Sequence, residues 1–249
     1  MPTLIPSKTL VRTIQYNHSL IESKIAQALE KSSRKRSDVL LLAVTKRQPD
    51  EVIHAAHAAG LRTFAENYPE EAVLKLERFK DLPGISWHLI GHIQSRKARL
   101  LKQGFNLIHS VDSLKLAGLL NRHREPLMPA QDVLVQVNVS AEESKFGFAA
   151  HEPGTIADLL KVLKEISALP YLRLRGLMIM PPLVEDAEEN RRYFRRAREL
   201  RDEIQETLRL PDFDQLSMGT SADYEVAVEE GATIIRLGSA LIGVRNYEI

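Results

Sequence analysis

The chain has 249 residues, of which 44% are hydrophobic and 27% charged, as in ordinary globular proteins. Its 34 basic side chains nearly balance its 33 acidic ones, so no strong field draws it to nucleic acid or to an anionic membrane. The absence of cysteine excludes disulfides and thiol catalysis and agrees with a reducing compartment. No apolar run approaches the roughly 18 residues of a membrane span, and no signal-peptide pattern is present, so we expect a cytoplasmic protein.

The chain opens with a helical pattern and then alternates strand patterns with helical ones. Apolar residues three, four and seven positions apart predict the first helix, which ends at a basic loop over 31–36. Strand patterns follow at 39–46, 62–65, 86–90, 106–109, 132–139, 173–178, 214–217 and 233–237. Helical patterns lie between and after them, at 52–59, 69–79, 97–101, 114–120, 156–166, 194–204 and 222–230. Thr155 and Asp158 have the spacing of a capping box for one of these helices.

This alternation predicts the fold. Eight strands that alternate with helices, preceded by one extra N-terminal helix, favour a single α/β domain over residues 1–249, a (β/α)8 TIM barrel. The strand over 132–139 places four valines on one face and Leu134, Gln136 and Asn138 on the other. We expect the more polar face to look into the barrel.

Lys46 ends the first predicted strand, after an unbroken apolar run from Val39 to Val44. Such a run is typical of a strand buried on both faces, and ligand chemistry gathers at the carboxyl ends of barrel strands. A partly desolvated lysine there loses its proton near neutral pH and attacks an aldehyde to form a Schiff base. The commoner alternative for this stretch alone is a strand-ending lysine that extends into water.

Two later loops have the chemistry of a phosphate site. Residues 217–223 follow the seventh strand and residues 236–239 the eighth, where barrels often hold phosphate. Thr220 and Asp223 mark a helix start whose free N–H groups suit an anion, and a glycine in each loop lets the backbone approach it. Ordinary capping and turn chemistry is the alternative. Together with Lys46, the two loops favour a phosphorylated ligand that carries an aldehyde.

Arg236 shares a strand face with Ile234, one residue out of phase with its apolar neighbours. If that face points into the barrel, a permanently charged guanidinium lies under the ligand. Opposite a pyridine nitrogen, it would keep that nitrogen unprotonated, because two cations in contact repel each other. The ring would then be a poor electron sink. An ion pair between strand and helix is the alternative role for Arg236.

These residues resemble the pyridoxal phosphate homeostasis protein family, which is itself similar to the barrel domain of alanine racemase, of fold-type III. The matching segments run in the family's order, at 43–46, 64–68, 87–95, 137–138 with 143–145, 175–178, 217–219 with 221–223, and 236–240. The resemblance implies that pyridoxal 5'-phosphate is held as an aldimine of Lys46, with Asn67 beside it and Arg236 facing the pyridine nitrogen. The implied cofactor-binding residues are Lys46, Asn67, Ser217, Met218, Gly219, Thr220, Ser221, Arg236, Gly238 and Ser239. Lys145 is implied to flank the mouth and to assist cofactor exchange.

The leading functional hypothesis is a cofactor carrier in intracellular vitamin B6 homeostasis that passes pyridoxal phosphate to apo-enzymes without efficient catalysis. An amino-acid racemase using the same aldimine and a barrel aldolase are the alternatives. Racemisation needs a base on each face, and in alanine racemases the second base is a tyrosine helped by a β-rich domain. Ile249 follows soon after the eighth strand, so we expect no such domain and no catalytic residues. We expect a monomer or weak dimer.

Two other sequence patterns are better explained by ordinary structural roles than by a binding site. His88 and His92 are spaced like helical metal ligands, but the stretch is strand-like and no cysteine or carboxylate pattern accompanies them, so we predict no metal site. The basic run at 191–201 is interleaved with acidic residues, which predicts a solvated helix face rather than a nucleic-acid surface.

Overall fold

The computed structural model of the chain describes residues 6–102, 104–124, 127–140, 142 and 146–243. Eight parallel strands close into a barrel, and neighbouring strands pair in the order β4-β3-β2-β1-β9-β8-β7-β5, with β5 returning to β4. They are β1 (Leu40–Val44), β2 (Thr63–Glu66), β3 (Ser86–Leu89), β4 (Leu107–Val111), β5 (Gln131–Asn138), β7 (Leu172–Ile179), β8 (Gln215–Ser217) and β9 (Ile234–Leu237). The predicted (β/α)8 barrel and its strands are confirmed.

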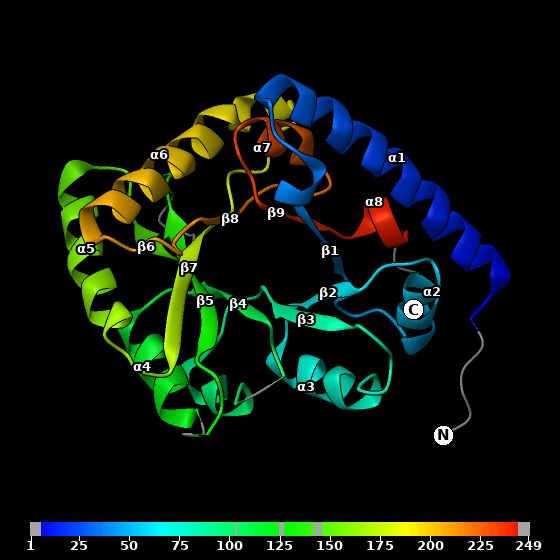
Figure 1. Cartoon of the computed structure of the whole chain (residues 1–249), viewed down its shortest axis with the longest axis horizontal. Coiled ribbons are helices and arrows are strands. Elements are labelled where there is room, and N and C mark those ends of the chain that lie inside the picture. Colours follow the sequence, from blue (N-terminus) through cyan, green and yellow to red (C-terminus); the bar gives the residue numbers. More distant parts are fainter. Residues whose placement is uncertain (1–5, 103, 125–126, 141, 143–145, 244–249) are drawn as a thin grey trace.

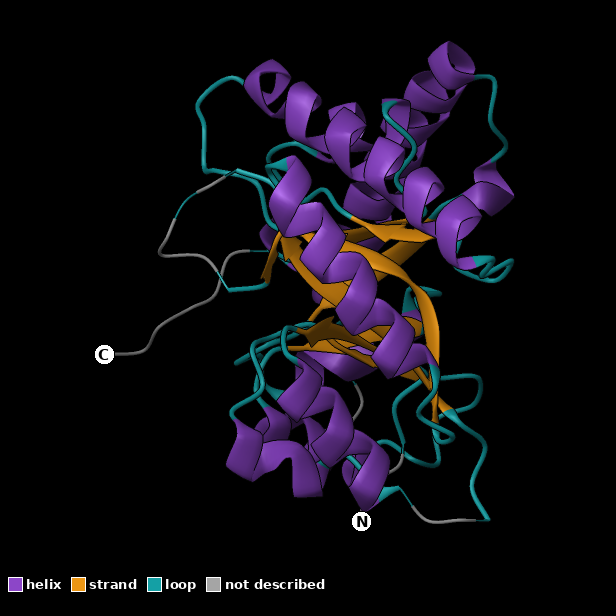
Figure 2. Cartoon of the chain, turned by 90° about the vertical axis from the view of Figure 1, so that its left-hand side faces the viewer, coloured by secondary structure: helices purple, strands orange, loops and turns teal. Residues whose placement is uncertain are grey.

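The helices form an outer layer around the strands (Figure 1), and they lie on both sides of the barrel when it is seen from the side (Figure 2). The α-helices are α1 (Lys8–Ser32), α2 (Asp50–Ala58), α3 (Pro69–Arg78), α4 (Leu114–His123), α5 (Pro153–Ser167), α6 (Arg191–Leu208), α7 (Tyr224–Glu229) and α8 (Ser239–Ile242). The predicted extra N-terminal helix is α1, which packs against α2, α7 and α8. Because α1 covers elements from both ends of the chain, it joins the first and last parts of the barrel.

Three short 3-10 helices and one short strand complete the described elements. The helices are η1 (Arg36–Asp38), η2 (Ser95–Leu100) and η3 (Ala187–Asn190), so the helical stretch predicted near residue 97 is a 3-10 helix. The strand β6 (Phe148–Ala149) was not predicted, and in the described structure it pairs with the end of β5 alone. In the described ranges, no helix has the length and hydropathy needed to cross a bilayer.

Two helix starts differ from the sequence prediction. The capping box of α5 joins Glu152 to Thr155, because a proline at position 153 begins the helix two residues before Thr155. The predicted box of Thr155 with Asp158 is therefore wrong. The helix α7 begins at Tyr224 with Asp223 as its N-cap, so Thr220 lies in the loop before the helix.

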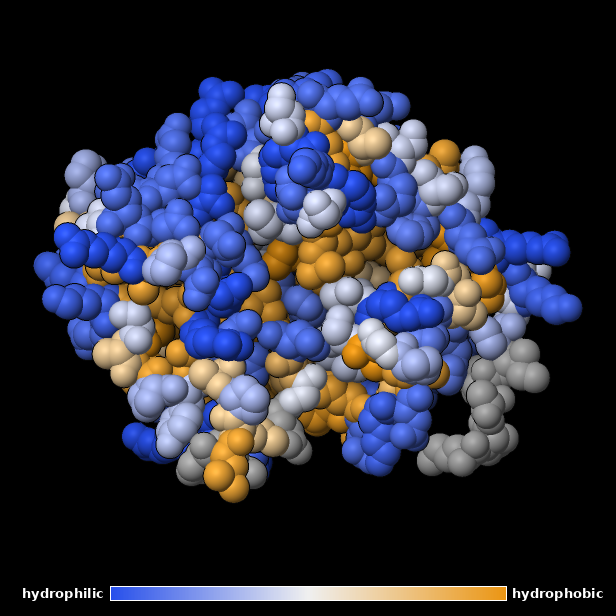
Figure 3. All heavy atoms as spheres, in the orientation of Figure 1, coloured by the Kyte–Doolittle hydropathy of each residue, from blue (hydrophilic) through white to orange (hydrophobic). Residues whose placement is uncertain are grey.

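The barrel separates two apolar layers. The larger lies between strands and helices and includes Val133, Val135 and Val137 of β5. The smaller fills the barrel interior and includes Leu134, which confirms that the more polar face of β5 looks inward. The buried polar side chains of Ser217, His109 and Arg236 also lie in the barrel interior, so the interior is a packed core of mixed polarity. Hydrophilic residues surround the face seen in Figure 3, and hydrophobic residues show through its middle.

Candidate functional site

A cavity of about 310 Å³ lies at the carboxyl ends of the strands, and it is large enough for a small cofactor. Seven of the ten predicted site residues line it, namely Lys46, Asn67, Thr220, Ser221, Arg236, Gly238 and Ser239. Val44, Ile90, Met180 and Ala222 supply the rest of the described lining. Within that lining, two side chains are basic and none is acidic. The cavity therefore favours an anionic ligand.

The turn that carries Lys46 is held from outside the barrel by a buried ion pair. Lys75 of α3 donates from Nζ to Thr45 O at 2.7 Å and to Glu66 Oε1 at 2.8 Å. The Thr45 hydroxyl donates to the same Glu66 oxygen at 2.6 Å. Burial raises the pKa of Glu66, and the Lys75 charge opposes that rise. Because Thr45 and Glu66 directly precede Lys46 and Asn67, this pair fixes the backbone behind two residues of the cavity.

Arg236 forms the floor of the cavity and is 3% exposed. Its guanidinium donates to Ser217 Oγ at 2.7 Å, to Ile179 O at 3.0 Å and to Met180 Sδ at 3.0 Å. In the described part of the chain, all its hydrogen-bond partners are thus neutral. Burial lowers the pKa of Arg236 to about 10, with the Asp223 charge opposing the shift. The group stays protonated at neutral pH, and its charge is not neutralised by a bonded carboxylate.

The two loops after β8 and β9 supply unbonded backbone donors. The N–H groups of Ser221, Gly238 and Ser239 have no acceptor among the described residues. By contrast, the Thr220 N–H and hydroxyl both donate to Asp223 Oδ1, at 2.7 and 3.1 Å. Thr220 therefore lines the cavity with its donors already bonded, whereas the other three residues line it and have N–H groups without an acceptor in the described structure.

Gly238 is not required by the packing of the protein. A Cβ built there would come no closer than 3.7 Å to Val44, an ordinary contact. Gly219 differs, because its φ is +91° and a Cβ would lie 2.6 Å from the Cβ of Ala227. Gly219 thus shapes the loop, whereas Gly238 leaves room beside the cavity.

Three predicted site residues do not line the cavity in the described structure. Ser217 is fully buried beneath Arg236, Met218 packs in the outer apolar layer, and Gly219 accepts the Arg236 N–H at 3.0 Å. They support the floor and the loop rather than the wall. Lys145 lies outside the described residues.

The sequence did not predict the pair of buried histidines that lies below Arg236. His109 Nδ1 lies 2.8 Å from Ser217 Oγ, and His109 Nε2 lies 2.9 Å from His88 Nδ1. Burial lowers the pKa of His88 to about 4, and burial with the nearby charges lowers that of His109 well below its usual range. The available signal was the parity of β4, in which His109 shares the inward face of Leu107.

His88 and His92 do not face a common site. His92 Nδ1 lies 2.8 Å from Asp112 Oδ2, and its ring stacks on Phe146 at 3.9 Å between centroids. His88 instead points into the barrel toward His109. Across the described ranges, no group of three or more histidines and carboxylates has an arrangement that could hold a metal ion.

Comparison with known proteins gives one family. The model of the alanine racemase N-terminal domain matches residues 21–246. A pyridoxal phosphate homeostasis protein of Pseudomonas aeruginosa is 42% identical over 235 residues, which cover 94% of this chain and 97% of that protein. The structure of PipY of Synechococcus elongatus with pyridoxal phosphate bound is 39% identical, has a TM-score of 0.76, and matches 88% of this chain and 100% of that one.

An alanine racemase of Clostridium difficile shares the fold alone. Its structure has a TM-score of 0.68 at 14% sequence identity. The match covers 95% of this chain but 58% of the racemase.

Proposed function

Because the chain belongs to the pyridoxal phosphate homeostasis protein family, we propose that it binds pyridoxal 5'-phosphate at the mouth of its barrel and takes part in vitamin B6 homeostasis. One observation carries the proposal: a single cavity brings the primary amine of Lys46 together with the buried cation of Arg236 and the free N–H groups of two loops. The cofactor supplies an aldehyde that reacts with primary amines and a phosphate dianion. Each has a matching group in the cavity.

The proposed contacts follow from the lining. Lys46 provides the amine that bonds to the aldehyde carbon, and Ser221, Gly238 and Ser239 bind the phosphate through their N–H groups. Asn67 lies beside the ring, and its Oδ1 is buried without a hydrogen-bond partner among the described residues, as a ligand-binding group would be. Arg236 faces the ring nitrogen.

We propose that this site holds the cofactor for delivery to apo-enzymes rather than turning over amino acids. Arg236 keeps a proton away from the ring nitrogen, which weakens the ring as an electron sink. Racemisation also needs a base on each side of the substrate. In the described lining, Lys46 and Arg236 are the titratable side chains, and a guanidinium does not act as a base.

Racemase activity is the second candidate, because the barrel resembles that of alanine racemase. It predicts sustained interconversion of alanine enantiomers by protein free of contaminating racemase, abolished by Lys46→Ala. We expect turnover at background level instead.

The proposed function is tested by reducing the protein with borohydride in the presence of pyridoxal phosphate and mapping its peptides. We expect violet absorbance that borohydride removes and a pyridoxyl group on Lys46. Lys46→Arg keeps the positive charge but removes the reactive amine, so it should take no label. Lys97→Arg is the matched control. Lys97 does not line the cavity, and its Nζ lies 2.7 Å from Glu70 Oε1 in an ion pair. A label on another lysine, or none on the unmodified protein, would refute the assignment.

A further inference from the structure

A line of four polar side chains runs through the barrel interior below the cavity. It begins at Arg236 in the floor and continues through Ser217 and His109 to His88. These side chains come from β9, β8, β4 and β3, so the line crosses the barrel between strands that are far apart in the sheet order. All four are buried, and His88 also lines a second cavity of about 530 Å³ with Leu40, Asp132 and Gln215, at the amino ends of the strands.

The donors and acceptors of these four side chains fix which atom donates in each hydrogen bond of the line. Arginine has donors only, so Arg236 must donate to Ser217 Oγ. Ser217 Oγ has one further polar contact in the described structure, to His109 Nδ1, so the serine proton finds an acceptor only if that nitrogen carries none. A neutral His109 then has its proton on Nε2 and donates to His88 Nδ1, which leaves the proton of His88 on Nε2 as well.

We propose that His109, supported by His88, is a positioning residue that orients the Ser217 hydroxyl so that its lone pair faces Arg236 and holds the guanidinium against the ligand. The inference rests on the proposed function, in which Arg236 faces the cofactor ring. A serine hydroxyl rotates freely unless its proton has a fixed acceptor. His109 is that acceptor. Without His109, the hydroxyl proton can turn toward Arg236. The hydroxyl then repels the guanidinium N–H instead of accepting a hydrogen bond from it.

Both histidines can keep this role across the physiological range. Burial favours their neutral forms, with the pKa of His88 near 4 and that of His109 well below its usual value. A charged His109 would bear a proton on Nδ1 and would break the line at Ser217. Its burial next to the Arg236 charge prevents this.

The first readout needs no cofactor. Nitrogen-15 spectra of the imidazoles at neutral pH should show both His88 and His109 neutral and protonated on Nε2. A proton on Nδ1 of either ring, or a charged ring, would show that the donors and acceptors assigned to these hydrogen bonds are wrong.

The second readout is the affinity for pyridoxal phosphate. His109→Leu removes the acceptor and should weaken binding by roughly 2- to 13-fold, the range for one neutral hydrogen bond. His109→Asn places a carbonyl oxygen near the position of Nδ1 and should restore most of the affinity. Ser110→Ala is the matched control, because Ser110 is a fully buried serine of the same strand that donates to Gly91 O outside the line. Its affinity should be that of the unmodified protein.

Binding of inorganic phosphate distinguishes a loss of Arg236 positioning from a general loosening of the site. Phosphate would bind the two loops but has no ring for Arg236 to face. His109→Leu and the unmodified protein should therefore bind it with the same affinity. Equal affinities of His109→Leu and the unmodified protein for pyridoxal phosphate, or equal weakening by the leucine and asparagine variants, would overturn the role of His109. If the unmodified protein takes no pyridoxyl label on Lys46, the proposed function fails and this role fails with it, whatever the imidazole spectra show.

Discussion

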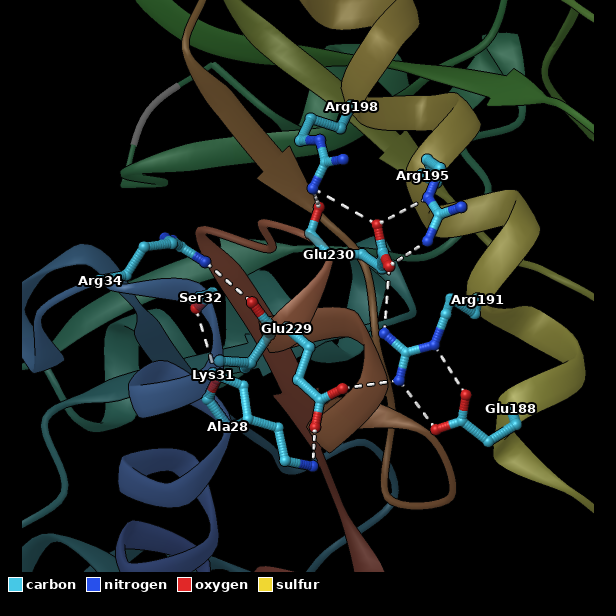
Figure 4. Close-up of polar contacts among 11 residues, drawn as sticks. Ala28, Lys31, Ser32, Arg34, Glu188, Arg191, Arg195, Arg198, Glu229 and Glu230 are labelled. Carbon is cyan, nitrogen blue, oxygen red and sulfur yellow. Dashed lines mark hydrogen bonds and ion pairs between the residues drawn. The ribbon is translucent and has the colours of Figure 1, made fainter.

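Two arginines of this protein lie in opposite electrostatic settings. Arg191 on α6 donates to three glutamates, Glu188 at 2.7 Å, Glu229 at 2.6 Å and Glu230 at 3.0 Å, in the cluster drawn in Figure 4. Arg236 in the barrel is more deeply buried and has neutral partners in the described structure. Consequently the pKa of Arg191 is raised, first by its hydrogen bonds to Glu188 and Glu229, whereas burial lowers that of Arg236.

The two settings suit different roles, a structural one for the Arg191 cluster and a ligand-binding one for Arg236. The outer cluster neutralises its charges internally and ties α6 to α7, while Lys31 extends the tie to α1 by pairing with Glu229 at 2.6 Å. Arg236 carries a charge that has no bonded counter-ion among the described residues. A buried charge without a counter-ion is costly, so such a charge is expected at a site where a ligand binds. Replacing residues of the outer cluster should therefore change stability, and replacing Arg236 should change ligand binding.

The largest expected effect concerns the charge of the ligand. Pyridoxal lacks the phosphate that the N–H groups of Ser221, Gly238 and Ser239 would bind. Each charge-assisted hydrogen bond is worth roughly 1.5 to 3 kcal/mol, so losing two or more should weaken binding about 100-fold or more. Titration of both compounds into the same protein measures the ratio. Equal affinities would show that these loops do not bind the phosphate.

The next effect concerns the neutral histidines of the interior. His88 stays neutral in the folded protein down to about pH 4, whereas in the unfolded chain it protonates near 6.5. The unfolded state therefore binds more protons in this window, and the free energy of unfolding should fall as pH drops from about 6.5 to about 4. His109 acts in the same direction.

A variant isolates this contribution. His88→Gln should remove about 3 kcal/mol of the acid-induced loss, at about 1.4 kcal/mol per pH unit. Urea unfolding at several pH values measures it. Titrating groups that do not contact His88, such as Glu66, occur in both proteins and cancel in the difference. His57→Gln is a control on the surface, where His57 bonds to Pro83 O. If the unmodified protein and His88→Gln lose stability in parallel, His88 is not held neutral.

The smallest effect breaks the outer cluster. Glu230 has a side chain only 6% exposed, and its carboxylate accepts hydrogen bonds from Arg191 and Arg195 and forms an ion pair with Arg198. Glu230→Gln should lower the free energy of unfolding by about 2 kcal/mol, because it removes a charged acceptor. Lys31→Met, at a side chain 68% exposed, should cost much less. Neither should change the affinity for pyridoxal phosphate. A loss of that affinity in Glu230→Gln would remove the distinction between the two regions.

Much of the fold was predictable because the barrel strands leave strong local patterns. The apolar run that ends at Lys46 and the parity that turns Arg236 inward both depend on neighbours within a few residues, and the structure agrees with both. The strand β6 has two residues and depends on pairing with β5, so its own sequence carries little signal.

Seven of the ten predicted site residues line the cavity, but the sequence did not predict the contacts that these residues make. Thr220 has the spacing of a helix cap, yet its donors bond to Asp223 within the loop. Ser217 belongs to a recognisable motif, but its partner His109 is 108 residues away, a contact that only the closed barrel creates. Lys75 looks like an ordinary charged helix residue, and the burial that pairs it with Glu66 depends on how α3 docks.

We propose that the cavity between Lys46 and Arg236 holds pyridoxal phosphate in one orientation. A crystal structure of the protein with this cofactor would show that orientation. We predict density continuous with Lys46 Nζ, the phosphate within hydrogen-bond distance of the N–H groups of Ser221, Gly238 and Ser239, and the ring nitrogen facing the Arg236 guanidinium. Density for the cofactor elsewhere, or a ring that turns its nitrogen away from Arg236, would contradict this orientation.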